Sequence, residues 1–274
     1  MVVYKAIEFV KSVDSGGSTY PWIVNVLTER GRVVPYVVKL FKDRHIKQQH
    51  AVAKEVFGNL LACEFDLPVP NCALIDFTSA FLATLKEEQL QKLTGVHAGL
   101  KFGSEFASAK TIATNGLLPA FLKDYDLGTI FAFDNLLQNL DRGGERDKPN
   151  LLIDDDKYLL IDHEQVFPFA NDANTRRGLD WSFDLPAWAN NYQACYKHLF
   201  FPVLKSYRRE TKRTLFDSFQ EYLRYVDVDL VDRAAEDLQR LDVSVGRADL
   251  ITDYLVQTQT RHAEFTRLLQ AIIA

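Results

Sequence analysis

Residues 133–167 read FDNLLQNLDRGGERDKPNLLIDDDKYLLIDHEQVF. The stretch opens with apolar residues spaced mostly three and four positions apart, a period typical of a helix. That pattern stops at Asp141, where a Gly-Gly pair, a cluster of charges and a proline indicate a loop. Two short apolar runs follow at 151–153 and 158–161, and the polar residues between them predict a hairpin. Asp162 comes directly after the second strand.

The order of three polar residues in this stretch points to phosphoryl transfer. Asp141 ends a helix, Asn150 ends the following loop, and Asp162 ends a strand. Transfer of a phosphoryl group needs a carboxylate that orients the attacking hydroxyl and oxygen ligands that hold magnesium on the phosphates. Taken singly, Asp141 and Asn150 also fit plain turn positions. Their order with Asp162 favours the functional interpretation, because three such residues seldom fall in this arrangement by accident.

The segments NLDR, PNLLI and LLIDHEQVF resemble the catalytic region of HipA-like kinases, bacterial proteins with a protein-kinase-like fold. They are similar, more weakly, to lipid kinases of the phosphoinositide type. The resemblance implies that Asp141 is the catalytic base and that Asn150 and Asp162 hold the metal. Nine positions separate Asp141 from Asn150, whereas protein kinases use Asp-x-x-x-x-Asn. Asp147, inside the longer loop, therefore stays a rival ligand.

The N-terminal part begins with a predicted strand at 2–10 and a predicted hairpin formed by 22–27 and 35–41. Between the first two strands lies a polar loop with adjacent glycines. A strand, a Gly/Ser loop and a second strand can fold over nucleotide phosphates, with backbone N–H groups directed at the oxygens. An ordinary turn is the alternative. The candidate cofactor-binding residues of this loop are Ser15, Gly16, Gly17 and Ser18.

Lys39 lies inside the apolar run 36–41, on a strand that otherwise has a buried composition. A buried ammonium needs a partner, unless its stem reaches along the sheet to solvent. The run follows the logic of the kinase Val-Ala-x-Lys strand, whose lysine contacts the nucleotide phosphates. A helix is predicted over 48–65, and the resemblance extends across it, because it leads into Leu-Pro-Val-Pro at 67–70. The resemblance makes Glu55 the acid paired with Lys39, and an exposed helix glutamate is the alternative.

Residues 97–106 are rich in small residues and lack a helical period. They follow a predicted strand at 71–78 and a predicted short helix at 87–93. The resemblance places the crossing between two lobes here, with backbone groups that bond adenine. We therefore expect a hinge over 101–107. Its cofactor-binding residues would be Lys101, Phe102 and Gly103.

The remainder of the chain is mainly helical from residue 117 onward, with strong apolar stripes over 193–274. The basic run at 207–213 fits a solvated helix connection. The predicted fold class is α+β, a two-lobed protein-kinase-like fold. We expect a β-rich N-lobe over 1–106 and a mainly helical C-lobe over 107–274, which carries the catalytic loop and the metal-binding hairpin.

Composition excludes several classes of protein. The 274 residues are 47% hydrophobic and 25% charged, as in an ordinary soluble globular protein. A net charge of −5 argues against direct nucleic-acid binding. Three cysteines without metal spacing fit a reducing cytosol. No apolar run approaches the roughly 20 residues that a membrane span needs, and the first residues have the composition of a strand rather than a signal peptide. We expect a cytoplasmic protein.

The implied activity is ATP- and magnesium-dependent phosphoryl transfer to a hydroxyl, in the first place that of a serine or threonine of a protein substrate. A small-molecule or lipid kinase would use the same residues with another acceptor pocket. A catalytically inactive nucleotide-binding regulator is the second alternative, favoured by the long loop between Asp141 and Asn150. HipA-like kinases include growth-arresting toxins paired with antitoxins, so the resemblance also suggests an antitoxin or another regulatory partner.

Overall fold

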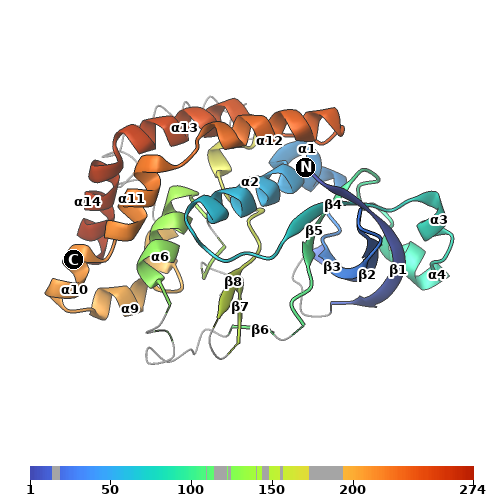
Figure 1. The fold of residues 1–274 in the computed structure, drawn as a ribbon, viewed down its shortest axis with the longest axis horizontal. Coiled ribbons are helices and arrows are strands. Elements are labelled where there is room, and N and C mark those ends of the chain that lie inside the picture. Colours follow the sequence, from blue (N-terminus) through green and yellow to red (C-terminus); the bar gives the residue numbers. More distant parts are fainter. Residues whose placement is uncertain are drawn as a thin grey trace.

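The computed structural model describes residues 1–13, 19–108, 110–113, 122, 125–139, 141–143, 148–154, 157–172 and 194–274. Within them the chain has a mixed α+β architecture (Figure 1). A β-barrel is formed by the N-terminal part, and the C-terminal part is mainly helical. One long helix from the N-terminal part lies between the barrel and the C-terminal helices (Figure 1).

Five strands close into a small barrel in the order β1-β2-β3-β5-β4. The barrel closes through the parallel pairing of β1 with β4, while the other neighbours are antiparallel. Alternate residues of the second strand, Trp22, Val24 and Val26, are fully buried in its interior, as the period of a strand requires. The strands are β1 (Val3–Ser12), β2 (Trp22–Leu27), β3 (Val33–Val38), β4 (Cys72–Asp76) and β5 (Lys101–Glu105).

The outer face of the barrel packs on helix α2 (Ala51–Glu64). Leu74 of β4 and Phe102 of β5 belong to the same apolar core as α2. Directly after this helix, Phe65 stacks on Phe219 and packs against Phe133, two rings of the helical part. The predicted helix over 48–65 is thus present. The described residues of the N-terminal part also form the short helices α1 (Asp43–Gln49), α3 (Ser79–Leu82) and α4 (Glu87–Lys92).

A second, three-stranded sheet has one strand before the buried helix α6 (Leu127–Leu136) in the chain and two strands after it. It contains the predicted hairpin, and its order is β6-β7-β8. Its antiparallel strands are β6 (Thr111–Ile112), β7 (Leu151–Ile153) and β8 (Tyr158–Leu160). This sheet joins the barrel side to the helical side of the molecule (Figure 1).

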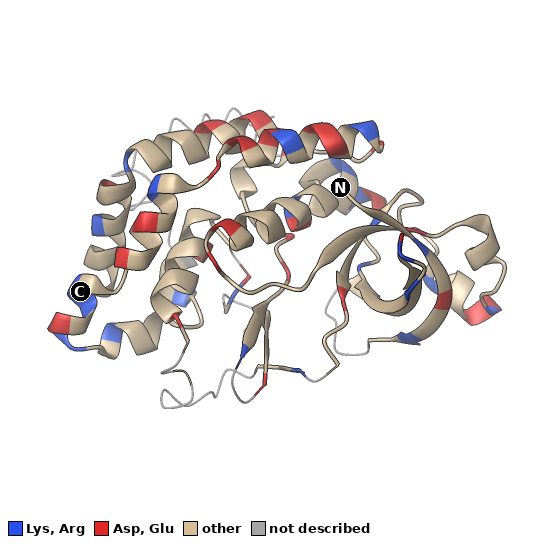
Figure 2. Ribbon diagram, viewed as in Figure 1, with Lys and Arg blue, Asp and Glu red and all other residues tan. Residues whose placement is uncertain are grey.

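The C-terminal helices form the large apolar core that the sequence pattern predicts. They are η2 (Pro168–Ala170), η3 (Ala194–Lys197), α9 (Phe201–Ser206), α10 (Arg209–Thr214), α11 (Asp217–Tyr225), α12 (Asp229–Arg240), α13 (Ala248–Thr260) and α14 (His262–Ile273). Figure 2 shows residues of both signs along the outer face of α12. Among the described residues, no helix is long and apolar enough to cross a membrane.

The loop after β8 touches α2 at one glycine. A Cβ atom on Gly58 would lie 2.4 Å from Cβ of His163. His163 is buried, packs edge-on against Phe133, and has a pKa lowered to about 3 by burial and by the nearby Arg142. The neutral ring therefore packs closely between α2 and the loop that follows the β7–β8 hairpin.

Replacing that glycine tests the close approach. We expect Gly58→Ala to destabilise the fold by about 1–3 kcal/mol, although alanine is the better helix former. The expected drop in melting temperature is several degrees, measured by calorimetry. Cys63→Ala, on an exposed position of the same helix, is the matched control and should change the melting temperature little. An increase in stability for Gly58→Ala would show that α2 and the hairpin are not in this contact.

Candidate functional site

The ammonium group of Lys39 is the centre of the candidate site. Lys39 follows β3 directly, and its backbone N–H donates to the carbonyl of Phe102 at 3.0 Å. Its Nζ donates to Glu55 and Asp162, and reaches Oε2 of Glu164 at 3.4 Å. A strand end, the helix α2 and the loop after β8 thus converge on one positive charge.

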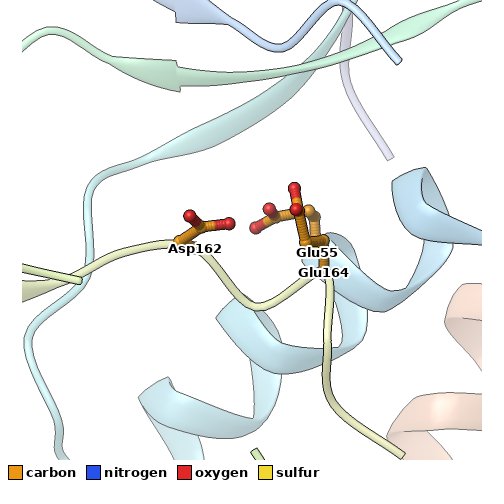
Figure 3. Close-up of side chains that lie close together, drawn as sticks. All are labelled: Glu55, Asp162 and Glu164. Atoms are coloured by element: carbon orange, nitrogen blue, oxygen red, sulfur yellow. The ribbon is translucent and has the colours of Figure 1, made fainter. Parts of the chain in front are cut away.

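Three carboxylates surround that charge. Figure 3 shows these three side chains, Glu55, Asp162 and Glu164, close together. One oxygen from each of Glu55, Asp162 and Glu164 lies within 4.8 Å of the others. Glu55 is only 1% exposed, and its Oε2 accepts a hydrogen bond of 3.0 Å from the backbone N–H of His163. This bond fixes Glu55 of α2 against the loop that carries the other two acids.

The charges in the cluster do not balance. Burial opposes the charge on Lys39, but Asp162 and Glu55 outweigh it and hold the pKa of the ammonium well above its ordinary value. Burial raises the pKa of Glu55 to about 7, and it also raises the pKa of Glu164. For Asp162 the attraction of Lys39 exceeds the effect of burial and lowers the pKa. One ammonium among three carboxylates leaves room for a further cation.

Asp141 and Asn150 lie side by side despite the nine positions between them. The amide Nδ2 of Asn150 donates to Oδ2 of Asp141 at 3.3 Å and to its carbonyl at 3.1 Å. Lys148 contributes an ammonium 3.0 Å from the same Oδ2. The loop closes at its base, where the backbone N–H groups of Gly143 and Lys148 each donate to the other residue's carbonyl, at 2.6 and 3.1 Å.

The hairpin brings Asn150 and Asp162 to one end of the small sheet. Leu151 pairs with Leu160, and the backbone N–H of Ile161 donates to the carbonyl of Asn150 at 3.2 Å. Both polar residues have left-handed backbone conformations, with φ of 47° and 67°, which Asn and Asp tolerate better than most residues. Carboxylate and amide oxygens suit Mg²⁺ or Mn²⁺, so the donor set at this end of the sheet fits a divalent ion.

The sequence matches the profile of HipA-like kinases over residues 7–180. The chain belongs to the HipA-like kinase family. A kinase-type phosphotransferase is therefore the kind of protein to which the site belongs. The search of curated proteins returned no match.

Solved structures place this HipA-like chain within a kinase fold. The crystal structure of the Helicobacter pylori proinflammatory kinase CtkA is similar with a TM-score of 0.51 and 10% identity, over 100% of this chain and 97% of that one. A structure of the complete CtTel1 dimer matches with a TM-score of 0.33 and 13% identity, over 98% of this chain and 12% of that one. The likeness to CtkA supports the α+β kinase-like fold class. The TM-score of the CtTel1 match is too low to add support.

The hinge predicted over 101–107 is wrong across most of its length. Lys101–Glu105 form β5, and Gly103 pairs with Val38 on one side and with Ala73 on the other. The backbone groups of this central strand are thus used in two ladders. The small residue is needed for packing, because a Cβ on Gly103 would lie 2.6 Å from the side chain of Ile75.

The side chain of Lys101 contacts a backbone carbonyl and an aromatic ring of the N-terminal part. Its Nζ donates to the carbonyl of Gly99 at 2.7 Å and lies 4.8 Å from the centre of the Phe77 ring. Of the other expected nucleotide contacts, Ser15, Gly16, Gly17 and Ser18 lie outside the described residues, as does Asp147.

Two charged residues of the site were missed in the sequence. Glu164 follows Asp162 by two positions, and that spacing after a strand was a signal that could have been used. Lys148 sits among the charges of the long loop, where nothing distinguished it from its neighbours. Only the fold of the loop shows that this lysine lies at Asp141.

A second buried lysine ties the start of α2 to the segment that follows the catalytic hairpin. Nζ of Lys54 donates to the carbonyl of Phe167 at 3.0 Å and to Oδ1 of Asn171 at 2.5 Å. One turn earlier, His50 bonds Asp172 at 3.0 Å and Ser244 at 2.9 Å. Burial lowers the pKa of Lys54 to about 7. The start of the helix that carries Glu55 is therefore held at two positions, His50 and Lys54.

The lowered pKa of Lys54 predicts a pH dependence of stability. Between about pH 7 and the ordinary value of 10.5 the unfolded chain binds more protons at this position than the folded chain, so stability rises with pH in that window. We expect the melting temperature of the wild type to gain more between about pH 7 and pH 9 than that of Lys54→Met.

The matched control is Lys47→Met, at an exposed lysine of α1. It should keep the wild-type slope of melting temperature against pH. The pKa of Lys101 is lowered to about 8 by burial, and its contribution is common to all three proteins. Equal slopes for the wild type and Lys54→Met would contradict a buried, pKa-shifted ammonium at this position.

Proposed function

We propose that this HipA-like kinase transfers the γ-phosphoryl group of ATP to a serine or threonine hydroxyl of a protein substrate, with magnesium. The observation that carries the proposal is the convergence of Lys39, Glu55 and Asp162 on one point. Asp141 and Asn150, which belong to the same catalytic hairpin and loop, add a base and an amide ligand.

In the proposed reaction Lys39 steadies the phosphates while Glu55 holds its ammonium in place. Glu55 suits that part because its other oxygen accepts a hydrogen bond from the N–H of His163, which holds the carboxylate against the loop after β8. Asp162 and Asn150 would hold Mg²⁺, which neutralises charge on the β- and γ-phosphates when bound. Catalysis would rest on positioning and electrostatic stabilisation.

Asp141 is the group proposed to orient the acceptor hydroxyl and receive its proton. Its Oδ2 lies 3.0 Å from Nζ of Lys148 and 3.3 Å from Nδ2 of Asn150. The charge and the hydrogen bond together fix the direction of the carboxylate. The closeness of Asp141 to Asn150 supports an active enzyme over a nucleotide-binding regulator without activity.

The division into a β-rich N-lobe over 1–106 and a helical C-lobe over 107–274 remains part of this proposal. It is supported by the end of β5 at Glu105 and by the absence of barrel strands in the described residues after it. With β5 fully paired, the backbone that bonds adenine would begin after Phe106, whose own N–H donates to the carbonyl of Pro35 at 2.9 Å.

Removal of the central ammonium is expected to abolish most of the activity. Lys39→Met keeps the length of the side chain but cannot neutralise phosphate charge, so kcat/KM with magnesium-ATP should fall at least about 100-fold. Steady-state kinetics on a generic protein acceptor, such as myelin basic protein or casein, would measure it. Lys47→Met is the matched control and should retain wild-type turnover. Near-wild-type turnover of folded Lys39→Met would exclude this lysine from the reaction.

Loss of one carboxylate is expected to remove the metal-dependent stabilisation by nucleotide. At a magnesium-ATP concentration 100 times its Kd, the wild type should gain about 2.7 kcal/mol of stability, seen as a rise in melting temperature of several degrees. Asp162→Asn should lose most of this rise, because it keeps the volume but not the charge. Asp253→Asn, on α13, is the control.

The same melting assay decides between the two candidates for the second ligand. Asp147→Asn should behave like the wild type if Asn150 is the second ligand. It should behave like Asp162→Asn if Asp147 is the second ligand instead. A full rise in melting temperature for Asp162→Asn would contradict the proposed metal site.

A further inference from the structure

Arg142 is fully buried beside Asp141, and the proposed reaction assigns it no role. Its Nε donates to Oδ2 of Asp134 at 2.5 Å. On its other side, Nη1 donates to the carbonyl of Pro149 at 3.3 Å and to the carbonyl of Asn150. One guanidinium thus joins helix α6 to the residue proposed as a metal ligand, across the whole length of the loop.

Asp134 is a fixed anchor for this guanidinium. It is completely buried on α6, where Oδ1 accepts from Nδ2 of Asn139 at 2.8 Å and Oδ2 is bonded to Nε2 of His198 at 3.0 Å. Burial opposes its charge, but Arg142 and His198 outweigh that effect and hold the pKa of the carboxyl well below its ordinary value. A buried ion pair with its remaining oxygens bonded in this way keeps a defined geometry.

The loop between Arg142 and Asn150 is closed at its base by backbone pairing of Gly143 with Lys148. Gly143, at φ +94°, pairs with Lys148, and a Cβ at Gly143 would lie 2.6 Å from the backbone nitrogen of Leu199. That nitrogen donates to the carbonyl of Arg142 at 3.1 Å. The extra residues therefore leave from a closed base, and their number need not change the distance between Asp141 and Asn150.

We propose that Arg142 is a positioning residue for the metal site: held by Asp134, it fixes the backbone of Asn150 so that its amide oxygen stays available to the ion. The inference rests on the proposed function, because it takes Asn150 as a ligand. The alternative is a buried ion pair that stabilises the fold and leaves metal binding unaffected.

Arg142→Lys separates the two roles. Lysine keeps a positive charge near Asp134, but its compact ammonium lacks the planar fork with which the guanidinium spans from the Asp134 carboxylate to the carbonyls of Pro149 and Asn150. Groups that orient metal ligands are worth about 10–100-fold in metal affinity. We expect the Kd for Mn²⁺ supplied as its complex with adenylyl-imidodiphosphate, measured by calorimetric titration of the protein, to rise by about that factor.

A double-mutant cycle with Asn150 gives the sharper readout. If Arg142 acts through Asn150, Arg142→Lys should weaken Mn²⁺ binding in the wild type and add nothing in Asn150→Ala. The same fold-change in both backgrounds, or an unchanged Kd in folded Arg142→Lys, would overturn the inference. Arg233→Lys, at an exposed arginine paired with Asp227, should leave Mn²⁺ affinity unchanged.

A second variant and a second measurement apply if Arg142→Lys does not fold. Asp134→Asn keeps the shape of the anchor while weakening its hold on Arg142, and should weaken Mn²⁺ binding in the same direction. In either variant the amide of Ile161, bonded to the carbonyl of Asn150, should exchange its hydrogen faster than in the wild type. Wild-type exchange and wild-type Mn²⁺ affinity in Asp134→Asn would overturn the inference.

The proposed function fails in a different way. If the wild type itself does not bind Mn²⁺ with the nucleotide analogue, or if Asn150→Ala alone leaves the Kd unchanged, the metal ligands are wrong and the role of Arg142 falls with them. If both bind as proposed and only the effect of Arg142→Lys is missing, the proposed function stands and the inference about Arg142 is wrong.

Discussion

The ammonium of Lys39, enclosed by Glu55, Asp162 and Glu164, is the interaction on which the rest of the structure depends. A buried charge without a partner is costly, so the four groups are stable only together. The barrel supplies the lysine, α2 supplies the first acid, and the loop after β8 supplies the other two. Correct placement of these three elements is therefore required by electrostatics as well as by packing. The resulting cluster has three carboxylates for one ammonium, and a bound divalent cation would offset the excess of carboxylates.

Helix α2 connects the cluster around Lys39 to the segments on both of its sides. Glu55 faces the site, Gly58 allows His163 to pack closely, and Lys54 holds the segment after the hairpin. On the other side of the hairpin, Arg142 and Asp134 connect the loop between Asp141 and Asn150 to α6. Both sets of contacts act on the backbone around Asn150 and Asp162. The geometry at the end of the small sheet is thus determined from two helices, and the loop between Asp141 and Asn150 can be long without separating its ends.

Much of the fold was predictable from periodicity, and part of the site from charge. The β-rich run of β2, the helical stripe of α2 and the two apolar runs of the hairpin each mark an element that the structure contains. A lysine buried in an apolar run needs an acidic partner, and the resemblance to HipA-like kinases indicated Glu55 as that partner. β5 was missed because its small residues, Gly103 above all, are selected by packing against Ile75 and not by strand propensity. Asp134, Arg142 and Lys148 were missed because their partners are set by tertiary structure, which leaves no mark on local spacing.

The central claim is that the cluster around Lys39 and the end of the small sheet form one site for a metal-bound nucleotide. A crystal structure with Mn²⁺ and a non-hydrolysable ATP analogue, with the ion located by its anomalous signal, tests this most directly. The account predicts one Mn²⁺ bonded to Asp162 and Asn150, with Nζ of Lys39 against phosphate oxygens and still paired with Glu55. An anomalous peak away from both ligands, or a nucleotide bound elsewhere with the Lys39 cluster unchanged, would contradict it.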